Sequence, residues 1–287
     1  MPPALPINKL QLNSIKQTNK HYEMNLYSEH YVSQKAERFV NKIWCLDNSI
    51  GESLIENKLV LPNGCFNLAI VNGNAIEVHT SKKKYEMNKG IYFCSQMTNK
   101  VLVNIEPKTT ITIIQLQAWT ISLFPDYDLS DFTDSIIKIN PSELPFKIQI
   151  ESDIETLLHT INLYFEKLAA LHSDQNTIEK ICEIIKIKEE EISVSEISTA
   201  LNSSQRLLQI KFKTATGLTI KKYIQILKFR KSVDQMVNSD LEKLKLTDVA
   251  LYNKYFDQSH FIKKFKDVTK TTPKMFNPDS YFLSQKR

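Results

Sequence analysis

Two short segments in the last third of the chain carry polar side chains of the kinds that hydrogen-bond to DNA bases. They are Ser204, Gln205, Arg206 and Gln209 in the first segment, and Gln258, Ser259, His260 and Lys263 in the second. An arginine can bond O6 and N7 of guanine, and a glutamine can bond N6 and N7 of adenine. Lys213 and Lys266 follow a few residues later and suit phosphate oxygens, which give affinity without sequence information. Ordinary protein surfaces also carry such residues, but their presence at equivalent places in two segments favours contact with DNA.

The two segments belong to a repeat whose copies lie 53 residues apart. Residues 208–223 (LQIKFKTATGLTIKKY) superpose on residues 261–276 (FIKKFKDVTKTTPKMF), so that apolar and basic positions recur together. A short apolar helical pattern precedes each copy, at 194–201 and 246–252. The sequence therefore predicts a duplicated two-helix unit, which is typical of a protein that holds DNA at two places.

Positive charge is concentrated in the duplicated region. The whole chain has a formal net charge of +5, whereas residues 206–287 hold 18 Lys and Arg against 7 Asp and Glu, a net charge of +11. A basic domain joined to a nearly neutral module is typical of proteins that bind a polyanion. A solvated lysine-rich surface would give the same count, so charge alone leaves both interpretations open.

Helix boundaries can be located from capping residues. Residues 193–196 (SVSE) form a capping box, which predicts a helix start just before Ile197. Residues 202–204 (NSS) predict a turn, and either serine can cap a second helix that runs to Thr216. Gly217 then stands where a left-handed residue usually ends a helix. In the second unit, Asp257 is the expected cap.

A long helix is expected between the two units. Residues 219–237 carry one apolar stripe through Ile220 and Ile224 and a second through Phe229 and Val233, so the helix should pack between two bodies. At 1.5 Å per residue its length would be about 28 Å. That length is close to the roughly 34 Å between successive major-groove faces of DNA.

The first half of the chain has a strand-like pattern. Short segments rich in Ile, Val, Phe and Thr are separated by Asn-Gly, Pro-Asn-Gly and similar turn signals, and lie at 39–46, 58–61, 66–71, 75–80, 90–94, 100–105 and 110–117. Several short strands punctuated in this way indicate a β-sandwich or barrel. A helical period follows at 151–171, where the apolar face could pack on its own barrel or on a second subunit. A further amphipathic helix is expected at 178–187.

Enzyme chemistry has little support in the sequence. The chain holds only 5 glycines and no Gly-rich phosphate loop, and Cys45, Cys65, Cys94 and Cys182 are scattered without a CxxC pair. His79 stands alone in the strand region, without the neighbours that a metal site would need. We therefore expect no catalytic residues, metal or cofactor. A cupin-like enzyme or small-molecule binding protein with a helical accessory domain remains the alternative.

The region 178–276 resembles the DNA-binding domain of AraC/XylS-type transcription regulators, in which a long helix joins two helix-turn-helix units. Residues 204–213 (SQRLLQIKFK) resemble the family's S-x-R-x-L-x-R-x-F-K stretch. The second unit resembles I-A-x-x-x-G-F-x-D-x-S-x-F-x-R-x-F-K…T-P through residues 249–273. Ile210 replaces the family's second arginine, which removes one contact. Lys254 and Lys270 replace frequent glycines, at a cost of about 1 kcal/mol wherever the backbone is left-handed.

Residues 61–68 (LPNGCFNL) are similar to an L-P-D-G-x-x-D/E-L pattern of uncharacterised β-rich sensor domains found ahead of AraC-type modules. This resemblance implies a cupin-like barrel. Four aromatic residues are candidates to line an effector pocket in it: Trp44, Tyr92, Phe93 and Trp119. Core aromatic residues are the alternative interpretation.

The expected fold class is α+β with two domains. We expect a β-rich effector-sensing or dimerisation domain at 1–150, a helical linker at 151–175 and a double helix-turn-helix domain at 176–287. The family resemblance implies double-stranded operator DNA as a partner, a possible small-molecule effector, a possible homodimer, contact with RNA polymerase and a cytoplasmic location. No signal peptide is expected in the first 16 residues, and the apolar run 111–124 is too short to span a bilayer.

Overall fold

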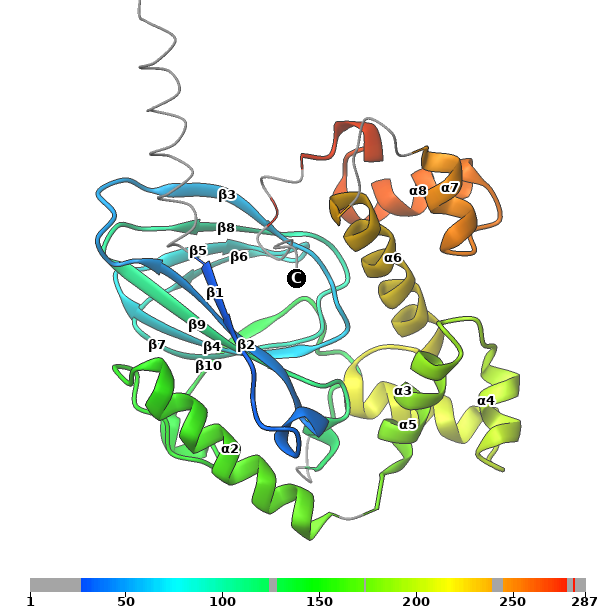
Figure 1. Cartoon of the computed structure of the whole chain (residues 1–287), viewed down its shortest axis with the longest axis horizontal. Helices are drawn as coiled ribbons and strands as arrows, with labels where there is room; N and C mark the ends of the chain where they lie inside the picture. Colours follow the sequence, from blue (N-terminus) through cyan, green and yellow to red (C-terminus); the bar gives the residue numbers. More distant parts are fainter. Residues whose placement is uncertain (1–26, 124–127, 173, 239–244, 278–280, 282–287) are drawn as a thin grey trace, which may run out of the picture.

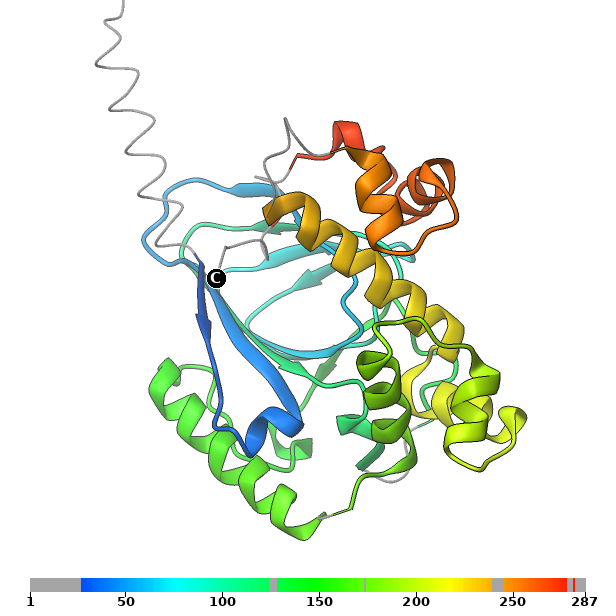
Figure 2. The ribbon, with the colours of Figure 1, turned by 45° about the vertical axis from the view of Figure 1, so that its right-hand side comes forward.

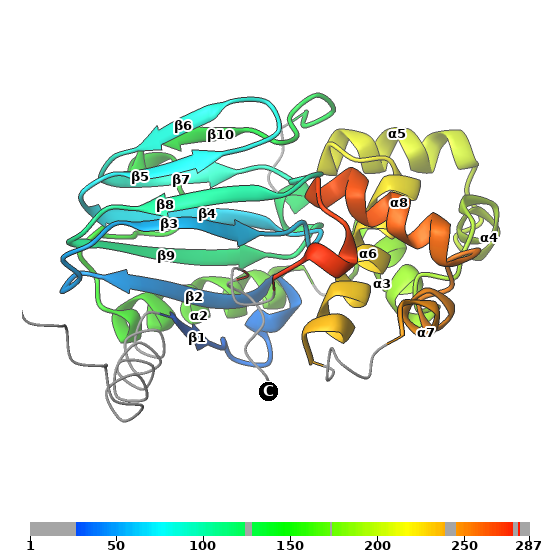
Figure 3. The ribbon, with the colours of Figure 1, turned by 90° about the horizontal axis from the view of Figure 1, so that it is seen from above.

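The computed structural model describes residues 27–123, 128–172, 174–238, 245–277 and 281 (Figure 1). The segment that bears on a signal peptide lies outside these residues. Within them the fold is α+β: strands form an N-terminal body, and helices form a C-terminal domain beside it (Figures 1 and 3). The predicted fold class is therefore confirmed, whereas the predicted boundaries at 150 and 176 remain predictions.

The N-terminal body is a sandwich of two antiparallel sheets. One sheet has the strand order β1-β2-β9-β4-β7-β10 and the other has the order β3-β8-β5-β6. The strands are β1 (Tyr27–His30), β2 (Val40–Asn48), β3 (Ile55–Val60), β4 (Phe66–Gly73), β5 (Ile76–His79), β6 (Lys84–Met87), β7 (Gly90–Cys94), β8 (Val101–Ile105), β9 (Thr109–Leu116) and β10 (Ile136–Ile139).

Both faces of the larger sheet are covered, which explains the imperfect alternation in its central strand β9. Ile111 and Ile113 point into the core between the two sheets. Ile114 and Leu116 point to the opposite face, where they join a second apolar cluster. A strand that is buried on both faces reads as a nearly continuous apolar run rather than as a strict alternation.

Helix α2 (Ile154–Leu171) forms much of the cover on that outer face. Asp153 caps it by accepting a hydrogen bond from the Thr156 amide at 2.8 Å. Its buried face includes Ile161 and Phe165, and the Phe165 ring stacks on Phe39 at a centroid distance of 5.7 Å. The sequence left two partners open for this helix, and the structure shows it packed on its own sandwich (Figure 1).

The C-terminal domain contains the helix α3 and two equivalent helix pairs around a long helix, α6. The helices are α3 (Thr177–Ile187), α4 (Val194–Ala200), α5 (Gln205–Thr216), α6 (Ile220–Asn238), α7 (Leu246–Tyr252) and α8 (Gln258–Thr269). Short 3₁₀ turns lie at Ala36–Arg38, Thr120–Leu123, Pro141–Glu143 and Pro273–Met275. The pairs α4/α5 and α7/α8 each combine helices of 7 and 12 residues. The predicted duplication is therefore a structural one.

Local backbone chemistry fixes the helix ends as predicted. The capping box of Ser193 and Glu196 is formed at the start of α4. Gly217 ends α5 in the left-handed region at φ 76°, and Lys270 ends α8 at the equivalent place with φ 63°. Lys254, in the turn between α7 and α8, is also left-handed at φ 55°. Two lysines thus occupy a conformation that disfavours residues with a Cβ atom.

Helix α6 lies between the sandwich and both helix pairs (Figures 1 and 2). Near its start, Ile220 and Ile224 join a cluster with α3, α5 and Ala118 of the sandwich domain. Near its end, Phe229 and Val233 join a cluster with α7, α8 and the inner face of the sandwich. The expectation of a helix packed between two bodies is confirmed.

Replacement of Lys270 by glycine should stabilise the fold, because glycine adopts the left-handed conformation without steric cost. We expect Lys270→Gly to raise the free energy of unfolding by about 0.5–1 kcal/mol, after allowance for the larger entropy of glycine in the unfolded chain. Lys263→Gly, in the middle of the same helix, should lower it by about 1 kcal/mol. Urea unfolding of the full chain measures both. Equal losses of stability in the two variants would contradict this account of the helix end.

Candidate nucleic-acid interface

The start of α5 exposes the predicted base-contacting residues of the first unit. Gln205, Arg206 and Gln209 are all exposed on its first turns, while Leu208 on the opposite face is buried. Ser204 is the N-cap, and its hydroxyl oxygen accepts a hydrogen bond from the Leu207 amide at 3.2 Å. The hydroxyl proton of Ser204 can still be donated to DNA, but its oxygen already serves the helix.

Two apolar side chains that the sequence analysis did not select are exposed on the same helix. Leu207 is 45% exposed and Ile210 is 53% exposed, although the other large apolar residues of α5 are buried. Apolar side chains on a recognition helix can contact the methyl group of thymine. At 3.6 residues per turn, Leu207 and Ile210 do not share the face of the buried Leu208 and Phe212, so their exposure could have been predicted from the sequence.

The start of α8 has the same arrangement in the second unit. Asp257 caps it by accepting a hydrogen bond from the His260 amide at 2.7 Å, as predicted. Ser259, His260 and Lys263 are exposed, whereas Gln258 is partly buried. The His260 ring lies edge-on to Tyr255 at a centroid distance of 5.7 Å. This contact holds the imidazole toward the space between the two units.

Lys213 and Lys266 occupy equivalent places toward the ends of α5 and α8, and both are exposed. Lys213 Nζ lies 3.8 Å from Oδ1 of Asp131, which belongs to the sandwich domain. An ion pair between exposed groups contributes little and exchanges readily for a phosphate. Both lysines are exposed, and phosphate contacts from them stay a prediction.

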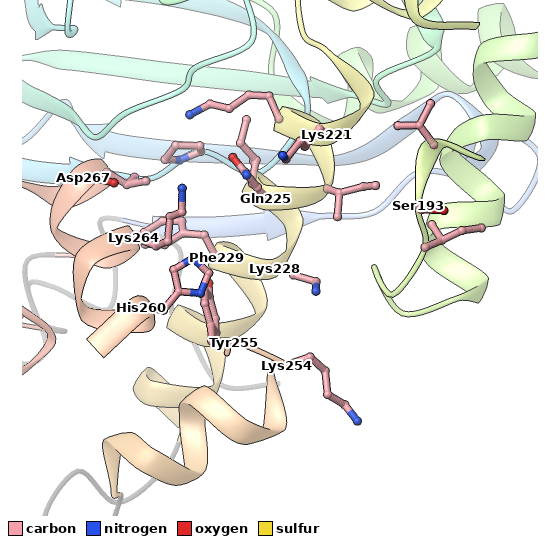
Figure 4. A pocket seen from close by; sticks show the side chains of 17 residues that line it. Ser193, Lys221, Gln225, Lys228, Phe229, Lys254, Tyr255, His260, Lys264 and Asp267 are labelled. Carbon is pink, nitrogen blue, oxygen red and sulfur yellow. The ribbon is translucent and has the colours of Figure 1, made fainter. Parts of the chain in front are cut away.

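A basic cleft of about 490 Å³ lies along α6 between the two units (Figure 4). The basic residues that line it are Lys221, Lys222, Lys228, Lys254, Lys264 and His260, and the acidic residue that lines it is Asp267. Burial lowers the pKa of Lys222. This cleft was not predicted from the sequence. The spacing of positions 221, 225 and 228, which share one face of α6, was the available signal.

The C-terminal ends of α5 and α8 are both hydrogen-bonded to loops of the sandwich. The Thr214 carbonyl of α5 accepts a hydrogen bond from the Leu129 amide at 2.8 Å. The Val268 carbonyl of α8 accepts one from the Lys100 amide at 3.0 Å. These loops are tied together, because the buried carboxylate of Asp134 accepts bonds from Thr98 N at 2.7 Å and Thr98 Oγ1 at 2.6 Å. One loop network thus holds both helices.

The four aromatic residues expected around an effector pocket are not gathered in one place. Trp44 and Tyr92 lie in the core between the sheets. Phe93 follows Tyr92 in β7 and therefore points to the opposite face, where it packs beside α2. Trp119 borders that outer cluster and the cluster around α3 and α5. Adjacent residues in a strand cannot line the same side of a sheet, which is the reason for this separation.

The histidine of the strand region, His79, is paired with a neighbouring carboxylate. His79 bonds to the Glu77 carboxylate on the same strand. Within the described residues, no three His, Cys, Asp or Glu side chains are arranged so that they could hold a metal ion. None of the described helices is both long enough and apolar enough to cross a lipid bilayer.

Two family models match parts of the chain. The model described as "Helix-turn-helix domain" matches residues 197–277. The model described as "Domain of unknown function (DUF6597)" matches residues 29–138. The first match covers both helix pairs, and the second covers most of the sandwich.

Curated relatives come from Staphylococcus aureus. An "Uncharacterized HTH-type transcriptional regulator" is 25% identical over 146 residues, which are 49% of this chain and 19% of the relative. Counterparts from strains MSSA476 and MRSA252 match to the same extent. The chain thus spans about a fifth of the length of the curated relatives that it matches.

The solved structures that the chain matches include ToxT from Vibrio cholerae O395, with 13% identity and a TM-score of 0.45 over 87% of this chain and 96% of that chain. The AraC-like transcriptional activator CuxR matches at 12% identity and a TM-score of 0.28, over 77% of this chain and 90% of that chain. The C-terminal domain of the response regulator yesN from Fusobacterium nucleatum matches at 27% identity and a TM-score of 0.31, over 35% and 96%.

The family match over residues 197–277 coincides with two helix-turn-helix units joined by α6, which is the arrangement that the repeat in the sequence predicts. Residues 197–277 thus carry a helix-turn-helix domain that resembles those of AraC-type regulators, and a match to DUF6597 lies ahead of it.

Proposed function

We propose that this protein is a sequence-specific DNA-binding transcription regulator. In this proposal α5 and α8 enter successive major grooves of one duplex, and the basic cleft along α6 faces the phosphates between them. The observation that carries the proposal is the equivalence of the two helix starts. Each helix has a side-chain oxygen as its N-cap and exposed polar side chains in its first turns. Each also carries an exposed lysine in its last turn, Lys213 in α5 and Lys266 in α8.

The two units have different roles in this proposal. Arg206 and Gln209 on α5 suit guanine and adenine edges, and Leu207 and Ile210 suit thymine methyl groups. The second unit contributes Ser259, His260 and Lys263, together with the basic residues of the cleft. It therefore combines base contacts with a larger share of the phosphate contacts.

The remaining partners follow from the family and from the need to reach DNA. We propose a cytoplasmic location, regulation through the sandwich by a small molecule or by homodimerisation, and contact with RNA polymerase. Wild-type ToxT from Vibrio cholerae strain SCE256 has been solved with a bound unsaturated fatty acid. For this chain we propose only the broader class, a small molecule with an apolar body. We propose no catalytic role for this protein.

Loss of a base contact should reduce discrimination rather than all binding. We expect Arg206→Ala and His260→Ala each to weaken binding to a selected operator by about 1–3 kcal/mol, roughly 5- to 150-fold, with less effect on random duplex. Fluorescence anisotropy with both duplexes at one salt concentration measures the ratio. Lys186→Ala, an exposed substitution on α3, is the control. If Arg206→Ala and His260→Ala left the ratio unchanged, the assignment of α5 and α8 as recognition helices would be wrong.

Loss of a phosphate contact should weaken binding to every duplex alike. We expect Lys213→Ala and Lys266→Ala each to lower affinity for operator and random DNA by similar factors. Each should also reduce the slope of log K against log salt by about 0.9, because one fewer counterion is released. DNA-binding titrations at several salt concentrations between about 50 and 200 mM measure this slope. Lys147→Ala, exposed on the sandwich domain, should leave the slope as it is. Equal slopes in all of these variants would exclude the two lysines from the interface.

A further inference from the structure

A second cavity, of about 390 Å³, lies on the outer face of the larger sheet. Its size falls within the range of small-molecule sites, which is roughly 300–1,000 Å³. Much of its wall is formed by Leu68 and Phe93 of the sheet, Phe132 of the loop before β10, Phe146, and Phe165 of α2. The cavity is separate from the core between the two sheets, because its wall belongs to the outer apolar cluster.

The wall presents aromatic rings in defined pairs. Phe93 stacks on Phe132 with a centroid distance of 6.0 Å and an interplanar angle of 6°. Phe146 and Phe165 are tilted against each other at 5.8 Å. Rings held in this way offer apolar surface to a hydrocarbon body, and their faces attract a nearby cation.

All polar residues in the described lining are acids. Asp128 and Glu143 contribute to the wall and are exposed, so they lie where the cavity meets solvent. Hydrogen bonds from the Ser130 hydroxyl and amide hold the pKa of Asp128 below its usual value. The positive charge of Lys213 also lowers the pKa of Asp128, and the Lys213 amine lies 3.8 Å from a carboxylate oxygen of Asp131. No Lys, Arg or His is part of the described lining.

We propose that this cavity binds an apolar small molecule that carries a cationic amine. The hydrocarbon or aryl body lies among the phenylalanines, and the ammonium group lies at the opening, between Asp128 and Glu143. An acid of the same shape is disfavoured, because its carboxylate would face two like charges. This binding site does not depend on the proposed DNA-binding function.

Some wall residues also hold the helical domain, which decides the choice of test variants. Leu129 donates a hydrogen bond to the Thr214 carbonyl, and the carbonyl oxygens of Leu129 and Phe132 lie 2.8 and 3.1 Å from the place of a Cβ atom on Gly217. Substitution of either residue would disturb the contact with α5. Asp128, Glu143 and the half-buried Ile139 avoid this complication.

The test compares three ligands that share a four-methylene phenylalkyl body and differ in the polar group: 4-phenylbutylamine, 4-phenylbutan-1-ol and 5-phenylpentanoate. Isothermal titration calorimetry on the full chain at low salt should rank them in this order, with the amine about tenfold or more tighter than the acid. In the double variant Asp128→Asn/Glu143→Gln the amine should lose most of this advantage, while the alcohol should bind as before. Ile139→Trp, which adds volume at the cavity wall, should weaken all three.

Matched controls are available on the opposite part of the sandwich. Asp47 Oδ1 accepts a hydrogen bond from the Ser49 amide at 2.8 Å, just as Asp128 Oδ1 does from Ser130 at 2.8 Å. The variant Asp47→Asn/Glu106→Gln therefore removes two exposed carboxylates of the same kinds and should leave the ranking intact. The proposal is overturned if the acid binds as tightly as the amine, if none of the three binds at millimolar concentration, or if Ile139→Trp, melting as the parent does, binds the amine unchanged.

Discussion

The burial of α6 on two sides is the constraint on which the rest of the structure depends. Its first half is covered by α3, α5 and Ala118, and its second half by α7, α8 and the sandwich core. Full burial of one large apolar side chain stabilises a protein by about 1.5–3 kcal/mol, and α6 contributes several, among them Ile220, Phe229 and Val233. Any rotation of one helix-turn-helix unit about α6 would expose part of this surface. The packing of α6 therefore sets the separation of the two recognition helices and their position relative to the sandwich.

Polar contacts make this arrangement specific. The buried carboxylate of Glu179 in α3 accepts two hydrogen bonds from Arg38, at 2.7 and 2.8 Å, and is 1% exposed. Removal of the arginine would leave a buried charge without a partner, which is strongly destabilising. Close backbone contact adds to this: a Cβ atom on Gly64 would lie 2.7 Å from the Tyr223 ring of α6. The same loop is held by Gln96, whose side-chain amide donates to the Gly64 carbonyl at 3.0 Å.

The sequence predicts the helical domain well because its signals are local. These signals are the helical period of apolar residues, the caps Ser193 and Asp257, and the terminating Gly217, and each depends on a few neighbouring residues. The helix ends lie within a residue or two of their expected places. Strands β1, β6 and β10 escaped prediction because each is four residues long and lies at or near a sheet edge, where the apolar pattern is weak. The contacts between domains could not be predicted, since Arg38 and Glu179 are 141 residues apart and only the fold brings them together. The basic cleft and the outer cavity depend on the same long-range packing.

The central claim is that one rigid arrangement presents two recognition helices to one duplex. Selection of bound sequences from a random DNA pool by the full chain tests it most directly. The account predicts two short conserved half-sites whose centres are separated by a single fixed distance of about one helical turn, roughly 34 Å. One half-site alone, or two half-sites whose separation varies freely among the selected sequences, would contradict it.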